Sequence, residues 1–308
     1  MVSCISERTR TSVVQRMTVY CRERFPLPSY GLITALFALC GLSLSSALRT
    51  GIAQFSLWQY TVAFIVTISL FFQLRVADEF KDNGDDCRYA PERPVPRGLV
   101  SLSELRNLAL ILGVSQLLFC LLFKPVLTIY LAMIWSYFAL MSREFFVSAL
   151  LRRHPIYYML SHMFILVFSD LFITAVDFAG TSGPSPGLLF FLCGSFANGM
   201  VIELGRKIKC PENERDGIES YSKALGIKPA LLLFLSSVLW AQAALVLALP
   251  RQHNVAALVF AIADMFVLAV VTRFLDHPGR RGQKLIEALS GLLVALSYLT
   301  VSLLCYFH

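Results

Sequence analysis

The chain alternates between long apolar runs and short polar segments that are mostly basic. A helix needs about 20 predominantly apolar residues to cross the hydrocarbon core of a bilayer, and nine runs reach or approach this length. These runs lie at Tyr30–Leu48, Ile52–Leu74, Leu105–Phe123, Val126–Met141, Ile156–Phe178, Leu188–Ile208, Ala230–Leu249, Val255–Leu275 and Leu285–Tyr306. The pattern therefore predicts an all-α integral membrane protein with nine transmembrane helices, of which the fourth is the shortest.

The composition is that of a membrane protein. Of the 308 residues, 56% are hydrophobic and 15% are charged, and the mean hydropathy is +0.66. Soluble domains usually contain about 25% charged residues. We expect residues 1–29 to form a basic cytoplasmic segment and residues 30–308 to form a single transmembrane domain.

The basic residues fall almost entirely on one side of the predicted spans. With the N-terminus in the cytoplasm, 24 of the 27 Lys and Arg residues lie in or beside cytoplasmic segments, and only Arg49, Lys124 and Arg251 lie on the opposite side. Lys and Arg accumulate in cytoplasmic loops, and the removal of one span would reverse the side of every later loop. The split therefore supports nine spans and predicts a C-terminus on the opposite side.

The net charge and the cysteines do not predict a further partner. Basic loops beside an anionic leaflet account for the net charge of +7, and no basic patch with interleaved aromatic residues indicates binding to nucleic acid. The eight cysteines form no CxxC pair, so neither a disulfide framework nor a zinc site is indicated.

An acidic stretch follows the second predicted span. Asp78, Asp82 and Asp86 recur every four residues, a spacing that places carboxylates on one face for as long as a helix persists. Asn83-Gly84 predicts the end of that helix, so we expect Asp86 to come from a loop that folds back. Like charges this close favour a cation between them, and oxygen ligands without His or Cys favour magnesium.

A proline-rich turn with arginines comes next, Arg93-Pro-Val-Pro-Arg-Gly98, and Arg88 precedes it. The prolines fix the backbone and the glycine relaxes it. Guanidinium groups beside carboxylate-bound Mg²⁺ are suited to holding a diphosphate. The alternative interpretation is a solvated loop whose charges only set the topology.

At these residues the sequence resembles the UbiA superfamily of intramembrane prenyltransferases. That family carries an NxxxDxxxD motif after its second span and an RPLPxG-like turn, and this chain has Asp78-x3-Asp82-x3-Asp86 and then RPVPRG. The resemblance implies nine helices in a ring around a central cavity, with the site on the cytoplasmic side. The chain departs from the family at Asp78, where Asn is usual, and Arg75, one turn earlier, is a candidate to balance the added charge.

A second acidic stretch, ELGRKIKCPENERDGIESYSKALG, follows the sixth span. Its recurrence at the same place relative to the helices predicts a pseudo-repeat with two half-sites that face one cavity. The family has DxxxD before a glycine here; Gly217 matches that region, but the strict Asp pair is missing. We assign a second metal to Glu203, Glu212 and Asp216, and phosphate oxygens to Arg206 and Lys207. The alternative is a charged loop with a Glu203–Lys207 ion pair at the helix end.

The resemblance implies Mg²⁺-dependent transfer of a prenyl group from a prenyl diphosphate to an unidentified acceptor within the bilayer. The implied catalytic and first metal-binding residues are Asp78, Asp82 and Asp86. The implied substrate-binding residues are Arg75, Arg88, Arg93, Arg206 and Lys207. Two alternatives stay open: a terpene cyclase that uses the same ionisation of the diphosphate, and a secondary transporter, which would explain the many spans and the pseudo-repeat.

Two carboxylates fall inside predicted spans, Asp170 in the fifth and Asp264 in the eighth. An unpaired carboxylate in lipid is costly, so both are predicted to face the bundle interior and to be paired or neutral. The alternative is a functional contact with an acceptor or a coupling proton. Arg143 and Glu144 end the fourth span and are interpreted as a snorkelling arginine beside a glutamate.

Overall fold

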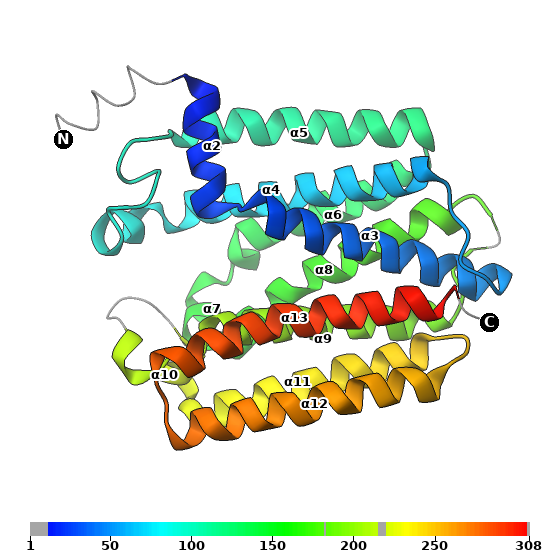
Figure 1. Ribbon diagram of the computed structural model, residues 1–308. Helices are drawn as coiled ribbons and strands as arrows, with labels where there is room; N and C mark the ends of the chain where they lie inside the picture. Colours follow the sequence, from blue (N-terminus) through cyan, green and yellow to red (C-terminus); the bar gives the residue numbers. More distant parts are fainter. Residues whose placement is uncertain (1–11, 182, 215–219, 307–308) are drawn as a thin grey trace.

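The computed structural model describes residues 12–181, 183–214 and 220–306, and within these residues it contains helices and no strands (Figure 1). In this described part of the chain, eight helices are long and apolar enough to cross a membrane, and α6 (Leu127–Ser142) is a shorter apolar helix. The eight are α3 (Leu27–Thr50), α4 (Leu57–Tyr89), α5 (Leu102–Phe123), α8 (Pro155–Phe178), α9 (Gly187–Lys207), α11 (Ile227–Ala248), α12 (His253–Asp276) and α13 (Arg280–Leu304). Each predicted span corresponds to one of these nine helices, which confirms the all-helical membrane fold.

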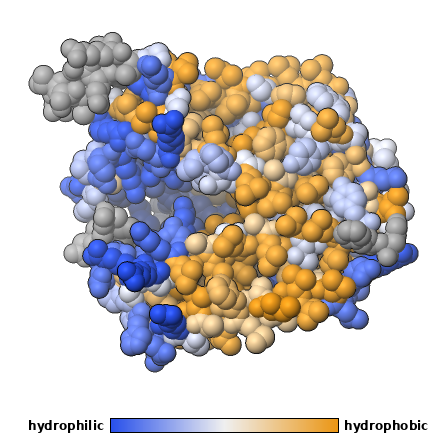
Figure 2. Space-filling model, viewed as in Figure 1, coloured by the Kyte–Doolittle hydropathy of each residue, from blue (hydrophilic) through white to orange (hydrophobic). Residues whose placement is uncertain are grey.

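The membrane helices form a closed ring. Helices that follow one another in the sequence pack side by side, α13 packs against α3 to close the ring, and α8 contacts α3 across it. We call the end of the bundle that holds the last turns of α4 and α9 the basic end. Figure 2 shows hydrophilic residues gathered at this end, around a recess, and apolar residues over the middle of the bundle. The C-terminal end of α13 lies at the opposite end (Figure 1).

Short helices cover the basic end. They are α2 (Val13–Arg24), η1 (Glu144–Phe146), α7 (Ser148–Arg153), η2 (Pro211–Asn213) and α10 (Tyr221–Leu225). The sequence pattern identified only a basic segment before the first span. In the structure, α2 buries Tyr20 against Phe72 of α4. Arg16 of α2 also forms an ion pair with Glu104 at 2.8 Å. Helix α2 therefore packs onto the transmembrane domain.

Close contact between α3 and α8 depends on Gly41. A Cβ atom at this position would lie 2.5 Å from Ile173 Cγ2 on α8, inside van der Waals contact. Both residues belong to the packed core of the bundle, where Ile173 is fully buried. Small residues at such crossings let helix backbones approach closely inside a membrane.

We expect Gly41→Ala to lower the stability of the bundle by about 1–3 kcal/mol, because the added methyl group overpacks the α3–α8 contact. The midpoint of thermal unfolding in detergent measures this effect. Gly31→Ala is a matched control in the same helix, since a Cβ atom there meets nothing within 4 Å. Equal midpoints for the two variants would contradict a tight contact at Gly41.

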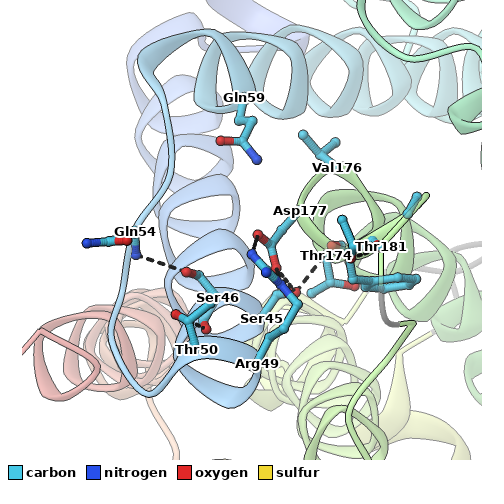
Figure 3. A network of polar contacts seen from close by, with 12 residues as sticks. Ser45, Ser46, Arg49, Thr50, Gln54, Gln59, Thr174, Val176, Asp177 and Thr181 are labelled. Atoms are coloured by element: carbon cyan, nitrogen blue, oxygen red, sulfur yellow. Dashed lines mark hydrogen bonds and ion pairs between the residues drawn. The ribbon is translucent and has the colours of Figure 1, made fainter.

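The end opposite the basic end is held by an ion pair between α3 and α8 (Figure 3). Arg49 donates hydrogen bonds to both oxygens of Asp177, through Nη2 at 2.8 Å and Nε at 3.3 Å. Ser45 donates a third bond to Asp177 Oδ2 at 2.8 Å. Lys124 donates to the carbonyl oxygen of Ala179 at 2.8 Å. Two of the three basic residues predicted at this end therefore fasten helix ends together.

The two predicted intramembrane acids differ in their surroundings. Asp170 is fully buried, and Tyr298 of α13 donates a hydrogen bond to its Oδ2 at 2.8 Å. Its placement inside the bundle, with a hydrogen-bonding partner, is as predicted. Asp264 of α12 is half-buried.

Candidate functional site

The C-terminal part of α4 extends beyond the apolar part of the helix. With 33 residues, α4 is about 50 Å long, whereas the hydrocarbon core is about 30 Å thick. The prediction that the helix ends at Asn83-Gly84 is wrong, because α4 continues to Tyr89. Gly84 costs the helix about 1 kcal/mol relative to Ala, and the ion pair between Asp86 and Arg93 holds the last turn in place.

Asp78, Asp82 and Asp86 therefore lie on one face of a continuous helix, but their surroundings differ. Asp86 is buried, pairs with Arg93 and lies 3.9 Å from Arg24 of α2. Asp78 is 51% exposed and lies 3.6 Å from Arg75. Asp82 is half-buried and has no ion pair within the described residues. The first two carboxylates thus remain available for a ligand, whereas the third is already neutralised.

Glu79, which the four-residue spacing passes over, is the most buried acid of this stretch. It is 1% exposed and accepts from Arg24 Nε at 2.7 Å and from Arg75 Nη2 at 3.1 Å. Arg75, predicted to balance Asp78, therefore lies between Asp78 and Glu79. Arg24 comes from α2, so the N-terminal helix contributes a cation to the site.

The proline-rich turn is anchored by its arginines. Arg97 forms an ion pair with Glu23 of α2 at 2.7 Å, and Gly98 adopts a positive φ of 79°, which glycine permits without strain. Of the two arginines predicted to bind substrate here, Arg93 faces Asp86. Arg88 is exposed and makes no ion pair in the part of the chain that the structure describes.

The second acidic stretch begins at the last turns of α9. Glu203 is buried and accepts from both Arg206 and Lys207, each at 2.7 Å. The predicted Glu203–Lys207 ion pair is confirmed. The structure does not bring Glu212 to this point, because Glu212 pairs with Arg280 at 3.0 Å on the exposed surface. Asp216 lies outside the described residues.

Tyr158 of α8 joins the two stretches. Lys81, from the first stretch, donates to Tyr158 Oη at 2.8 Å, and its Nζ lies 4.4 Å from the centre of the ring. Lys207, from the second stretch, lies 5.4 Å from the same ring centre. The ring of His162 stacks on the ring of Tyr158, with the two ring centres 3.8 Å apart. The two predicted half-sites therefore meet through residues that the motif comparison did not identify.

Electrostatics couple the same groups. Desolvation by the surrounding protein raises the pKa of Asp78 above its usual value, Arg75 and Arg206 act in the opposite direction, and Glu203 adds a smaller rise. Desolvation also raises the pKa of Asp82, and the negative charge of Asp78 raises it further. Asp78 and Asp82 thus repel each other in a partly desolvated setting, which favours a cation between them.

The possible metal ligands occur here as a pair. Among the described residues, no group of three His, Cys, Asp or Glu side chains is arranged to hold a metal ion. Mg²⁺ commonly binds to one or two carboxylates together with substrate phosphates. Asp78 and Asp82 meet that requirement, with cations from α4 and α9 around them.

Comparison with known proteins gives a fold but no family. No protein-family model matches the chain, and no curated protein sequence matches it. Among solved structures, the chain is similar to a digeranylgeranylglyceryl phosphate synthase studied in membranes, with a TM-score of 0.59 and 15% sequence identity. The similarity covers 91% of this chain and 98% of that chain. The protein is therefore a multi-pass membrane protein with the fold of that synthase.

Proposed function

We propose that the protein transfers a prenyl group from a prenyl diphosphate to an acceptor within the membrane. The fold supports this function, since the similar solved structure is a membrane synthase whose name describes a lipid with prenyl chains. The charges at the basic end support it independently, because the exposed Asp78 and the half-buried Asp82 lie with several cations beside an apolar bundle. The same observations do not favour a cyclase or a transporter.

The observation that carries the proposal is the meeting of Lys81 and Lys207 at Tyr158, next to Asp78. A diphosphate is a compact, multiply charged anion, and ammonium groups are suited to it as point charges. The two lysines come from stretches that are distant in sequence. Their convergence gives one headgroup site rather than two separate charged loops.

We assign Mg²⁺ to Asp78 and Asp82. Bound there with a diphosphate, Mg²⁺ would act as a Lewis acid that stabilises charge on the leaving group. Asp86 and Glu203 have guanidinium or ammonium partners, so we assign them to the positioning of those cations.

The side chains of the protein have different roles in this reaction. Arg206 and Lys207, held by Glu203, neutralise phosphate oxygens on the α9 side, and Lys81 does so on the α4 side. The apolar side chains of the ring hold the prenyl chain and keep water from the allylic cation. We propose that the basic end faces the cytoplasm, as the distribution of Lys and Arg predicts.

The test uses the full-length protein in lipid nanodiscs. A prenyl thiodiphosphate is expected to raise the unfolding midpoint in Mg²⁺ and not in EDTA, because binding to the folded state stabilises it by about 2.7 kcal/mol at 100 times the dissociation constant. Geranylgeranyl diphosphate with a membrane lipid extract should release diphosphate and yield a prenylated lipid. Failure of farnesyl and geranylgeranyl compounds to bind in Mg²⁺ would overturn the proposal, and cyclic products without an acceptor would identify a cyclase.

A further inference from the structure

A cavity of about 820 Å³ opens at the basic end beside the candidate site. It lies between α4, the start of α5, the end of α6 and α7, and its polar lining consists mainly of Lys81, Arg106, Arg143, Glu144 and Arg152. Asp78 and Asp82 do not line it, because they occupy the neighbouring face of α4. Lys81 is the residue that the cavity shares with the candidate site. Apart from Lys81, the cavity is lined by residues to which the proposed prenyl transfer gives no role.

The charge of this cavity is unbalanced. Four cations line it against one carboxylate, and that carboxylate, Glu144, already pairs with Lys81 at 2.9 Å. Within the described residues, Arg106, Arg143 and Arg152 have no ion-pair partner, and Arg152 makes only a 3.4 Å hydrogen bond to Ser148. Three guanidinium groups around one hollow repel each other until an anion lies between them. Phosphate, like carboxylate, matches the fork of hydrogen-bond donors on a guanidinium group, and it carries more negative charge for three such groups to share.

The turn that leads α6 into the cavity wall is conformationally strained. Glu144, Phe145 and Phe146 have φ values of 48°, 52° and 60°, a left-handed region that side chains disfavour. Each such residue costs on the order of 1 kcal/mol or more, and such strain is often retained at ligand sites. Here the turn ends α6 after 16 residues and leaves Arg143 and Glu144 in the lining. The predicted snorkelling arginine therefore faces a cavity.

Exposed apolar side chains lie next to the cationic lining. Phe80, which also lines the cavity, is 44% exposed, and Phe146, Val147 and Leu150 of the adjoining segment are 75%, 44% and 48% exposed. Phe146, Val147 and Leu150 follow α6, an apolar helix, and Phe80 belongs to the part of α4 beyond its apolar run. A basic cavity with an apolar rim is suited to an amphiphile with a phosphate headgroup. Basic pockets between membrane helices bind anionic lipid headgroups.

We infer that this cavity binds the phosphate headgroup of an anionic amphiphile in the leaflet at the basic end. The guanidinium groups of Arg106, Arg143 and Arg152 hold the phosphate, and the chains of the amphiphile lie along the apolar rim. This binding does not depend on the proposed prenyl transfer, and its test contains no prenyl donor.

Native mass spectrometry of the detergent-solubilised full chain measures the binding. Dioleoyl phosphatidic acid is the probe, dioleoylglycerol is the same lipid without phosphate, and sn-glycerol 3-phosphate is the headgroup without chains. We expect retention of phosphatidic acid alone, weakened at least about tenfold in Arg106→Gln/Arg143→Gln, because each lost charged hydrogen bond weakens binding by roughly that factor. Glu144→Gln, which removes the one negative charge, should strengthen retention.

The matched control is Arg153→Gln beside Arg152→Gln. Arg153 is exposed on the same short helix but does not line the cavity, so only Arg152→Gln should weaken retention. Equal unfolding midpoints show that both variants are folded. Equal retention of phosphatidic acid by these two variants, or of dioleoylglycerol by the unmodified protein, would overturn the inference. Displacement of phosphatidic acid by equimolar glycerol 3-phosphate would overturn the assignment to an amphiphile and identify a soluble phosphate instead.

Discussion

Replacing Asp82 by asparagine is expected to lower the rate of prenyl transfer at least about 100-fold, a loss typical for removal of one charge-stabilising group from an active site. Asp82 is half-buried beside Asp78 and has no ion pair among the described residues, so its charge is available for a ligand. Diphosphate release in Mg²⁺ with saturating prenyl donor measures the rate. The substitution keeps the shape of the side chain, and the unfolding midpoint should change little.

Glu92→Gln is the matched control, because Glu92 is an exposed acid just after the end of α4 and has no ion pair among the described residues. It removes the same charge and should leave the rate within about twofold of the unmodified protein, as surface substitutions usually have small effects. If both variants lost activity equally, the site would depend on the overall charge of the helix end. If Asp82→Asn kept full activity, the assignment of Asp82 would be wrong.

Replacing Asp177 by alanine is expected to destabilise the bundle by about 1–3 kcal/mol, the usual cost of removing a buried partner from charged hydrogen bonds. Asp177 is 3% exposed, and its loss leaves the Arg49 guanidinium without its acceptor between α3 and α8. The free energy of unfolding, from denaturation in mixed micelles, measures the effect.

The double variant Arg49→Met/Asp177→Leu should recover part of this loss, because it removes both charges and fills the space with apolar atoms. Asp276→Ala is the control for removal of an acid from a helix end, since Asp276 is exposed at the end of α12. A loss below 1 kcal/mol for Asp177→Ala, or a double variant less stable than the single one, would show that the pair does not fasten these helices.

Much of the fold could be predicted from sequence because hydropathy sets each membrane helix almost independently of its neighbours. The runs at Leu105–Phe123 and Val126–Met141, for example, correspond closely to α5 and α6. The segment before the first span was harder to interpret. Its helix α2 is stabilised by tertiary contacts of Tyr20 and Arg16, and such contacts leave no periodic apolar signal of membrane-spanning length.

The candidate site was only partly predictable. The four-residue spacing found Asp78 and Asp82, but it could not show that Asp86 is neutralised by Arg93, because that pairing depends on the path of the turn. The same spacing passed over Glu79. Tyr158 was hidden inside a predicted span, and the available signal was an aromatic hydroxyl in the first turns of that span, one turn before His162.

The docking of α2 has a practical consequence for shortened versions of this protein. A version that started just before α3 would retain every hydrophobic span and would look complete by hydropathy. It would nevertheless lack Arg24, whose guanidinium contacts Glu79 at 2.7 Å, and it would uncover the aromatic surface that Tyr20 covers at Phe72. Inactivity of such a version would reflect a lost wall of the headgroup site, and affinity tags are better placed at the other terminus.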